Sequence, residues 1–265
     1  MICLIFFIIN SGRSDTLNHS ESNNTQVYKS EVSEKKNNDL TNHPNNSSQN
    51  IYDENIIRHR HYSFVYSEIH EQPLWVKYVN TKQSVSSKNF KRKNNFRTDP
   101  LVKTNSASLE DYKKSGYDRG HLCPAGDMAF SEIAMSESFF MSNMSPQHPS
   151  FNRGIWKKLE SKVREWSNKY DSTIIYCGGV LDSLITTIGP NNVSVPKLYY
   201  KVIYCPKIEN GIGFILPNKK CDNSLENYVV NIDSVESITH INFYNNLPLN
   251  FQENIEKNYT LNLWF

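Results

Sequence analysis

The sequence predicts an α+β domain with a mixed, largely antiparallel central sheet flanked by helices. Three observations lead to this class: short aromatic and β-branched runs separated by turn residues, one long amphipathic helical pattern in mid-chain, and no internal repeat. With 265 residues, 38% hydrophobic and 12% aromatic, the chain is long enough to bury a core. We therefore expect residues 51–265 to form a single such domain.

The N-terminal residues differ in composition from the rest of the chain. Residues 1–12 include an apolar run, MICLIFFIIN, which is too short to cross a bilayer as a helix and suits the core of an export signal, although it lacks a basic start. Residues 13–50 are rich in Asn, Ser, Lys and Glu and bury too little apolar surface to fold alone. We expect a signal-like segment, a disordered linker, and a secreted or periplasmic protein with no stable membrane span.

Two strands and a basic loop open the domain. Residues 62–66 and 74–79 are aromatic and β-branched, and the break at 71–73 makes them neighbouring antiparallel strands. The loop that follows suits contacts to phosphates and bases, and it equally suits a solvated surface. Its cations are Lys88, Lys91, Arg92, Lys93 and Arg97, with Phe90 and Phe96 between them.

Three short elements come next. A capping box at 108–111 predicts a short helix that ends at Gly116. Residues 131–137 predict a capped helical turn, and the apolar residues 139–141 predict a strand that stops at Asn143.

The clearest helix spans residues 152–170, where apolar side chains recur at steps of three and four. These side chains are Ile155, Leu159, Val163, Trp166 and Tyr170. Beyond it, we expect strands at 174–177, 199–204 and 212–216, the last two joined by an Asn210-Gly211 turn, then a strand at 225–230 and a short helix capped by Asp233.

Charge and cysteine content leave several classes open. The formal net charge is only +2, so attraction to a polyanion must come from local patches. The five cysteines include no C-x-x-C pair, which gives a structural zinc site little support. Disulfide bonds and buried thiols both remain compatible with the spacing.

The residues Asp118, Arg119 and His121, with Gly120 between them, offer the groups that phosphodiester hydrolysis requires. An imidazole can take a proton from water, a guanidinium fork can hold phosphate oxygens, and a carboxylate can fix the local geometry. The alternative is a salt bridge at a strand end.

The predicted helix adds an amide, a carboxylate and a second guanidinium. Glu160 and Arg164 lie four residues apart and share one face. Asn152 comes eight residues before Glu160, so the amide and the carboxylate can border one pocket. An ordinary surface ion pair is the alternative.

These motifs together resemble the DNA/RNA non-specific endonuclease family. The resemblance rests on Tyr117-Asp-Arg-Gly-His-Leu122, on Ser142-Asn-Met-Ser-Pro-Gln147, and on the segment from Phe151 to Glu160. Their order and spacing agree with the family, and the similarity extends from about Tyr62 to the C-terminus.

The resemblance implies a ββα-metal (His-Me finger) nuclease core and a role for each motif residue. His121 is expected to be the general base, and Asn152 the one direct protein ligand of a Mg²⁺ ion, for which Mn²⁺ is a possible substitute. Water is expected to fill the other metal positions, as Mg²⁺ favours. The remaining catalytic residues are Glu160 for the metal-bound waters, Asn143 for orientation, and Arg119 and Arg164 for the phosphate charge by resemblance, together with Asp118, which can fix the local geometry.

The resemblance also implies the substrates, the products and the partners. Contacts to the phosphate backbone carry no base information, so DNA and RNA are both expected to be cut, leaving 5′-phosphate and 3′-hydroxyl ends. Arg97, Lys91, Arg92 and Lys93 are the expected substrate-binding residues. Family members include homodimers, which makes a dimer possible here. Two alternatives are a catalytically inactive nucleic-acid-binding protein on the same scaffold and a nuclease toxin with a protein inhibitor.

Two features depart from the pattern. Residues 123–128 differ from the mitochondrial members of the family and resemble bacterial secreted members, so no mitochondrial role is implied. Asn143-Met-Ser145 is also a glycosylation sequon, which favours either a bacterial source or an inaccessible Asn143.

Overall fold

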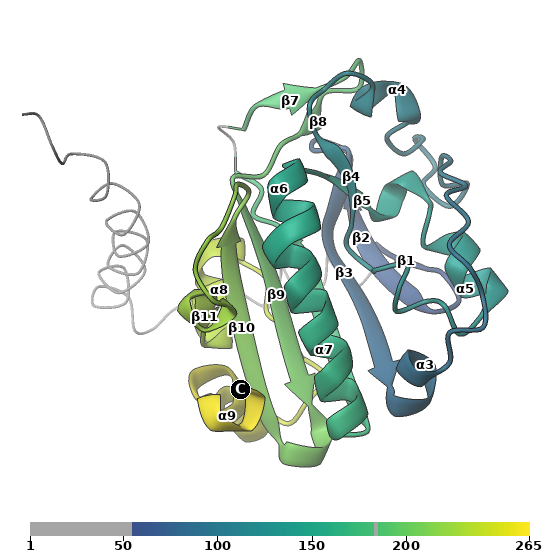
Figure 1. Ribbon diagram of the computed structural model, residues 1–265. Coiled ribbons are helices and arrows are strands. Elements are labelled where there is room, and N and C mark those ends of the chain that lie inside the picture. The colour runs from purple at the N-terminus through teal and green to yellow at the C-terminus, as the bar shows by residue number, and fades with distance from the viewer. Residues whose placement is uncertain (1–54, 183–184) are drawn as a thin grey trace, which may run out of the picture. The chain divides into compact units, whose positions relative to one another are not determined.

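The computed structural model describes residues 55–182 and 185–265, which fall within one compact unit (Figure 1). The signal-like segment expected at residues 1–12 and the linker expected at 13–50 lie outside the described residues. The strands are β1 (Ile56–Arg58), β2 (Tyr62–Ser67), β3 (Gln72–Thr81), β4 (Asp118–His121), β5 (Met144–Gln147), β6 (Ser172–Gly179), β7 (Thr187–Ile188), β8 (Val193–Ser194), β9 (Leu198–Cys205), β10 (Asn210–Pro217) and β11 (Val229–Val230).

Helices connect and cover these strands (Figure 1). They are α3 (Lys82–Ser86), α4 (Leu109–Tyr112), α5 (Glu132–Glu137), α6 (Pro149–Phe151), α7 (Lys157–Lys169), α8 (Ile232–Thr239), α9 (Leu249–Lys257) and α10 (Leu261–Trp264). Among the described residues, none of the helices has the length and apolar content that crossing a bilayer requires.

The main sheet has seven strands in the order β1-β2-β3-β6-β9-β10-β11, and all neighbouring pairs are antiparallel. The predicted α+β class with a largely antiparallel sheet is therefore confirmed. So is the pairing of the first two predicted strands, now β2 and β3. The turn between them comes earlier than expected, since Gln72 already belongs to β3 and Glu71 takes a positive φ of 51°.

Helix α7 covers one face of the sheet (Figure 1). Leu159, Val163 and Trp166 recur at helical steps and pack with sheet residues such as Ile175 in the larger core cluster. The opposite face packs against α8 and α9 in a second cluster that includes Tyr176. Because successive side chains of a strand alternate between faces, β6 contributes to both cores.

A strand pair followed by helix forms the unit that will carry the site. Strands β4 and β5 are antiparallel, with His121 opposite Met144 and Gly120 opposite Ser145. After β5 the chain enters α6, a π-helical segment and then α7. A Cβ at Gly120 would lie 2.2 Å from the side chain of Gln147, which is fully buried, so this position requires glycine.

Several local expectations were wrong. Residues 139–141 do not form a strand, because Asn143 N bonds to Phe140 O in a 3₁₀ turn that precedes β5. The Asn210-Gly211 pair opens β10 instead of making the turn, which is built by 206–208 and a left-handed Glu209. Residues 225–228 form a 3₁₀ turn, leaving only β11 as strand, and α4 ends four residues before Gly116.

Two capping expectations had different outcomes. Ser108 and Asp111 form the predicted capping box of α4. The predicted Asp233 cap is wrong, since Asn231 caps α8 by accepting a hydrogen bond from Ser234 N at 3.0 Å. No disulfide joins the four cysteines of the described residues, and three of those cysteines are buried in the core.

Candidate active site

His121 ends strand β4 in a largely aromatic enclosure. Its imidazole makes edge contacts with Phe139, at 4.9 Å between ring centroids, and with Phe96, at 5.6 Å. Only 8% of the residue is exposed. The Trp156 indole nitrogen, from the segment that opens α7, lies 3.5 Å from the His121 carbonyl oxygen. His121 is thus fixed to the strand through its own backbone and to the segment that opens α7 through Trp156.

The hydrogen bonding of His121 selects one tautomer. Its Nε2 is buried and has no hydrogen-bond partner among the described residues. The ring does hydrogen bond to the Arg119 backbone, and this bond must therefore use Nδ1. A backbone carbonyl can only accept a hydrogen bond, so Nδ1 carries the hydrogen and donates it, and the lone pair of Nε2 stays unused.

The surroundings of His121 also keep it neutral. Burial, together with the nearby charges of Arg92 and Arg119, lowers the pKa of His121 from 6.5 to about 3, against the weaker opposing effect of its backbone hydrogen bond. An unprotonated imidazole with a free Nε2 is the form that a general base requires.

Asp118 orients the amide of Asn152. Its Oδ2 accepts a hydrogen bond from Asn152 Nδ2 at 2.9 Å, and Arg153 donates to both of its oxygens, at 2.8 and 2.6 Å. Because the amide nitrogen of Asn152 donates to Asp118, its Oδ1 is the atom of the amide turned away from this carboxylate. Asn152 begins a π-helical segment, in which Gly154 has non-helical torsion angles. Such segments are frequent at functional sites.

Glu160 lies on α7 above a buried lysine. Burial raises the pKa of Glu160 to about 7, while the positive charge of Lys201 is the strongest opposing influence. Lys201 is fully buried on β9, with Nζ 4.5 Å from the Trp156 ring centroid and 3.4 Å from the Tyr78 hydroxyl. From its position on β9, Lys201 therefore stabilises the negative charge of Glu160.

Arg164 is held by an aspartate that the helical spacing does not reveal. Its NH1 donates to Asp127 Oδ1 at 2.6 Å and its NH2 to Ser161 Oγ at 2.9 Å. Asp127 is fully buried and also accepts from Asn80 at 2.8 Å. The alternative interpretation, a surface ion pair between Arg164 and Glu160, is therefore wrong, because in the described part of the chain Arg164 forms its ion pair with Asp127.

Two guanidinium groups lie next to the rings that enclose His121. Arg119 lies over Phe96 at 4.3 Å, and Arg92 lies over Phe139 at 4.8 Å. Both affect the pKa of His121, and Arg92 also acts on Glu160. The basic loop therefore brings at least Arg92 to the site.

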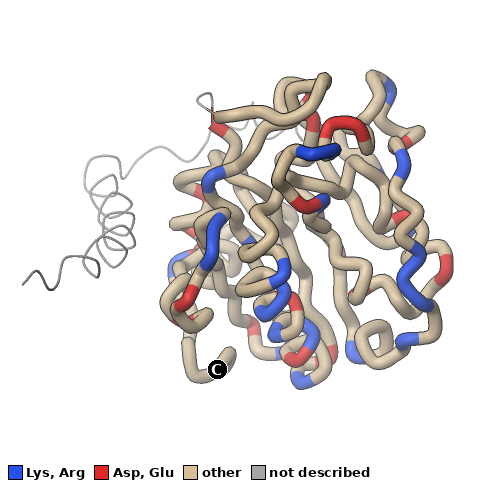
Figure 2. Tube along the Cα trace, turned by 45° about the horizontal axis from the view of Figure 1, so that its top comes forward, with Lys and Arg blue, Asp and Glu red and all other residues tan. Residues whose placement is uncertain are grey.

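The other loop cations are placed differently. Lys93 forms an ion pair with Glu132 at 2.7 Å, and Lys91 is exposed. Figure 2 shows Lys and Arg interleaved with Asp and Glu along the chain, in keeping with the small net charge.

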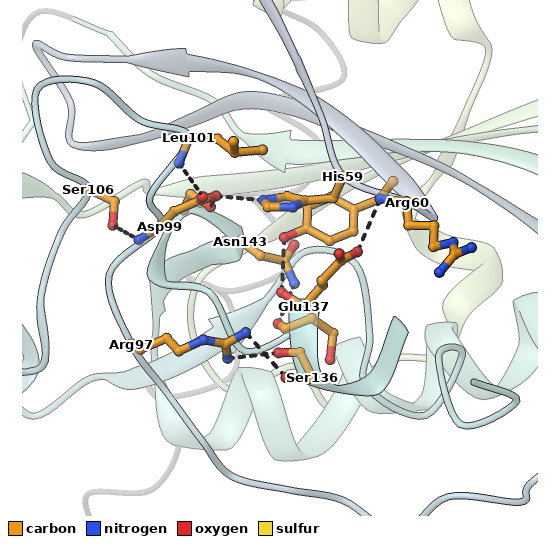
Figure 3. Close-up of polar contacts among 12 residues, drawn as sticks. His59, Arg60, Arg97, Asp99, Leu101, Ser106, Ser136, Glu137 and Asn143 are labelled. Atoms are coloured by element: carbon orange, nitrogen blue, oxygen red, sulfur yellow. Dashed lines mark hydrogen bonds and ion pairs between the residues drawn. The ribbon is translucent and has the colours of Figure 1, made fainter. Parts of the chain in front are cut away.

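Arg97 and Asn143 belong to a hydrogen-bonded network beside the site (Figure 3). Arg97 donates to the backbone oxygen of Ser136 at 2.9 Å and lies 3.8 Å over the Phe140 ring. Asn143 is fully buried, accepts from Cys123 N at 2.8 Å and donates to Cys123 O at 2.9 Å. Asn143 thereby fixes the backbone just after His121 and is inaccessible to glycosylation.

Asp99 holds a further group of hydrogen bonds in this region (Figure 3). It accepts hydrogen bonds from His59, at 2.7 Å, and from Ser142. A serine nucleophile needs its hydroxyl bonded to the histidine. Here both residues bond to the carboxylate, so the three form a structural cluster.

Three residues of the site were not predicted from the sequence: Arg153, Asp127 and Lys201. Arg153 could have been predicted, since it directly follows Asn152. Asp127 pairs across 37 residues, and Lys201 lies within an apolar strand, where sequence patterns give no sign of an inward-facing charge.

The comparisons with known proteins identify the family. A histidine that ends an antiparallel strand pair, followed by a helix that begins with an asparagine, is the arrangement of a ββα-type nuclease scaffold. The family model described as DNA/RNA non-specific endonuclease matches residues 36–250, and the chain belongs to this family.

Relatives and a solved structure support the assignment. Nuclease EXOG, mitochondrial, of Danio rerio is 32% identical over 198 residues, covering 68% of this chain and 57% of the relative. Nuclease 1, mitochondrial, of Schizosaccharomyces pombe is 34% identical over 213 residues, covering 71% and 65%. A structure of the EndoG/EndoGI complex aligns with a TM-score of 0.69 and 28% identity over 78% of this chain and 95% of that chain. The chain therefore spans less than two thirds of these two curated relatives.

The expected localisation is wrong. Export was inferred from the apolar run at residues 1–12, whereas both curated relatives above are named as mitochondrial nucleases. A short apolar run without a basic start is weak support for a secretory signal. The similarity of residues 123–128 to secreted members was likewise no guide to the compartment.

Proposed function

We propose that the chain is a metal-dependent endonuclease that hydrolyses phosphodiester bonds of DNA and RNA, leaving 5′-phosphate and 3′-hydroxyl ends. The observation that carries the proposal is the unpartnered, buried Nε2 of His121, whose other ring nitrogen is bonded to the Arg119 backbone. A buried polar atom without a partner is costly unless it has a use. A nucleic-acid-binding protein without catalytic activity would have no use for this unpaired ring nitrogen.

His121 acts as the general base. Nε2 accepts a proton from water, and the resulting hydroxide attacks the phosphorus while the P–O3′ bond breaks. As His121 takes the proton it becomes a cation, and the aromatic rings of Phe96 and Phe139 border that charge. The 3′-oxygen leaves and is protonated by solvent, which gives the 3′-hydroxyl.

The residues present fit a hard divalent cation. Asn152 offers an amide oxygen, because its nitrogen is bonded to Asp118, and Glu160 offers a carboxylate on the same helix. Mg²⁺ prefers oxygen ligands and needs only a few from the protein, because it retains several of its water ligands. Mn²⁺ is a possible substitute. When bound, the cation supplies neutralisation of the phosphate and leaving-oxygen charge.

Backbone phosphates are the expected substrate contacts. Arg119 and Arg92 lie beside His121, and charged contacts of this kind carry no base information. Hence DNA and RNA are both proposed as substrates. Arg164, Arg97, Lys91 and Lys93 remain proposed contributors to phosphate binding, with Arg164 also held by Asp127.

We also propose two kinds of protein partner, an inhibitor and a second copy of this chain. A protein inhibitor is favoured by the neighbouring structure, which is a complex of EndoG with EndoGI, described as a mechanism of inhibition. A homodimer remains a proposal from the family resemblance alone.

Cleavage assays test the function. Purified full-length protein is incubated with plasmid and with RNA, with Mg²⁺ or with EDTA, beside His121→Ala. His240→Asn, at an exposed left-handed position, is the matched control. We expect cleavage by wild type and control only with Mg²⁺. Equal survival of both substrates with wild type and His121→Ala, while both proteins still bind them, would overturn the proposal.

A further inference from the structure

A cavity of about 620 Å³ is lined by residues of β1, β2, β3 and β6, of the loop between β1 and β2, and of the segment after α8. Four of its lining residues form one row of directly opposed strand positions: Arg58, Ser63, Lys77 and Tyr176, on β1, β2, β3 and β6. Opposed residues share a face of a sheet. Tyr176 packs with the cluster of α8 and α9, so the whole row faces away from His121 and α7.

The described residues of the lining are cationic and include no acidic side chain. They include Arg58, Arg60, His61 and Lys77, whereas no Asp or Glu of residues 55–182 and 185–265 lines the cavity. In the described part of the chain, Arg58, Arg60 and Lys77 take no part in any ion pair. Cations that lie close together in a cavity without a counter-charge repel one another, and their combined positive potential attracts an anion.

The unfavourable effect of the neighbouring positive charges is clearest at Lys77. Burial and the neighbouring charge of Arg58 lower the pKa of Lys77. Its Nζ lies 5.0 Å from the centroid of the Tyr176 ring. The carboxylate of Glu137 accepts a hydrogen bond from the Arg60 backbone at 3.0 Å, while the Arg60 guanidinium points away from it (Figure 3).

Aromatic rings and amides complete the lining. Trp75 and Tyr176 meet edge to face at 5.5 Å, and the segment after α8 adds Asn242, Asn245 and Asn246. Cations for phosphate, rings for base stacking and amides for base edges are the groups that bind nucleotides. The cavity volume falls within the range of small-molecule sites.

We propose that this cavity is a second ligand site, separate from the catalytic centre, which binds a nucleoside monophosphate either free or as the 5′-phosphorylated end of a strand. Arg58, Arg60 and Lys77 hold the phosphate, and the base lies against Trp75 and Tyr176. This site goes beyond the proposed function, since nothing in it takes part in hydrolysis.

The test is nucleotide binding followed by tryptophan fluorescence on the full chain in EDTA. Titration with 5′-AMP is expected to quench the emission, and Trp75→Phe to abolish that change. Lys77→Met and, separately, the exposed-site variant Arg58→Gln are each expected to weaken binding about tenfold, as loss of a charge-assisted contact does. The exposed Lys103→Gln, outside the cavity, is the control.

Further arms identify the ligand. Inorganic phosphate is expected to bind more weakly than 5′-AMP, and equal affinity would overturn the nucleotide assignment. In the His121→Ala chain, Trp75-dependent quenching by a 5′-phosphorylated oligonucleotide but not by its 5′-hydroxyl counterpart assigns a strand end, and such quenching by 5′-AMP alone assigns the free nucleotide. An unchanged dissociation constant in folded Lys77→Met and Arg58→Gln, or quenching that survives in Trp75→Phe, would refute the site. Because these measurements need no hydrolysis, they succeed or fail independently of the cleavage assays.

Discussion

The Asp118 carboxylate accepts a hydrogen bond from Asn152 Nδ2 at 2.9 Å and so determines which end of the Asn152 amide is free. Arg153 holds the same carboxylate through two further hydrogen bonds. The strand thus orients the proposed metal ligand on the helix. Without this contact, the amide could rotate and present its nitrogen, which cannot bind a cation.

Asp118→Ala is therefore expected to weaken metal binding about 10- to 100-fold, the usual cost of losing a residue that orients a metal ligand. The measurement is the Mg²⁺ concentration that gives half-maximal cleavage. Asp171→Ala, which removes a surface pair with Lys207, should leave that concentration unchanged. An unaltered Mg²⁺ requirement in Asp118→Ala would show that Asn152 needs no such orientation.

His121 also predicts a pH dependence of stability. Its pKa is about 3 in the folded chain and about 6.5 when unfolded. Below pH 6.5 the unfolded chain binds a proton that the folded chain does not, so stability is fully present above pH 6.5 and is lost as the pH falls toward 3. The contribution of this one group approaches about 1.4 kcal/mol per pH unit within that window.

Urea unfolding between pH 6.5 and 4 measures this slope. Replacing His121 with Gln removes the titrating group, so the free energy of unfolding of His121→Gln should depend less steeply on pH than that of wild type. Parallel curves for the two proteins would mean that His121 titrates normally.

The Asp127–Arg164 pair predicts a strong stability effect. Arg164→Met leaves the Asp127 carboxylate buried without its cation, and breaking such a pair costs about 3–5 kcal/mol. Adding Asp127→Asn keeps the shape and removes the charge. We expect the double variant to be more stable than Arg164→Met in chemical denaturation, whereas additive losses would show that the two side chains do not interact.

From the positions of Arg92 and Lys93 in the basic loop, we expect these two residues to contribute differently to DNA binding. Arg92 lies over Phe139 beside His121, whereas Lys93 is paired with Glu132. Arg92→Gln should therefore weaken DNA binding and reduce the slope of log affinity against log salt by about 1, and Lys93→Gln should change it less. Equal slopes for Arg92→Gln and wild type would mean that the loop faces solvent only.

Much of the catalytic unit could be predicted because its signals are local. The amphipathic spacing from Leu159 to Trp166 indicated α7, and the order of His121 and Asn152 carried the family resemblance. Contacts between distant segments left no such signal. Arg164 pairs with Asp127 across 37 residues, and the spacing on α7 favoured Glu160 instead.

The strand predicted at residues 139–141 failed for a related reason. Phe139 and Met141 are fully buried because they pack beside the site, and burial alone does not distinguish a strand from a 3₁₀ turn.

Chemical rescue of the missing imidazole tests the general-base role of His121 most directly. Single-turnover cleavage of a short DNA duplex is measured for His121→Ala with Mg²⁺, with and without added imidazole. We expect a rate about 10²- to 10⁴-fold below wild type, partly restored by imidazole in proportion to its neutral fraction. A wild-type rate in the variant, or a slow rate that imidazole leaves unchanged, would contradict this role.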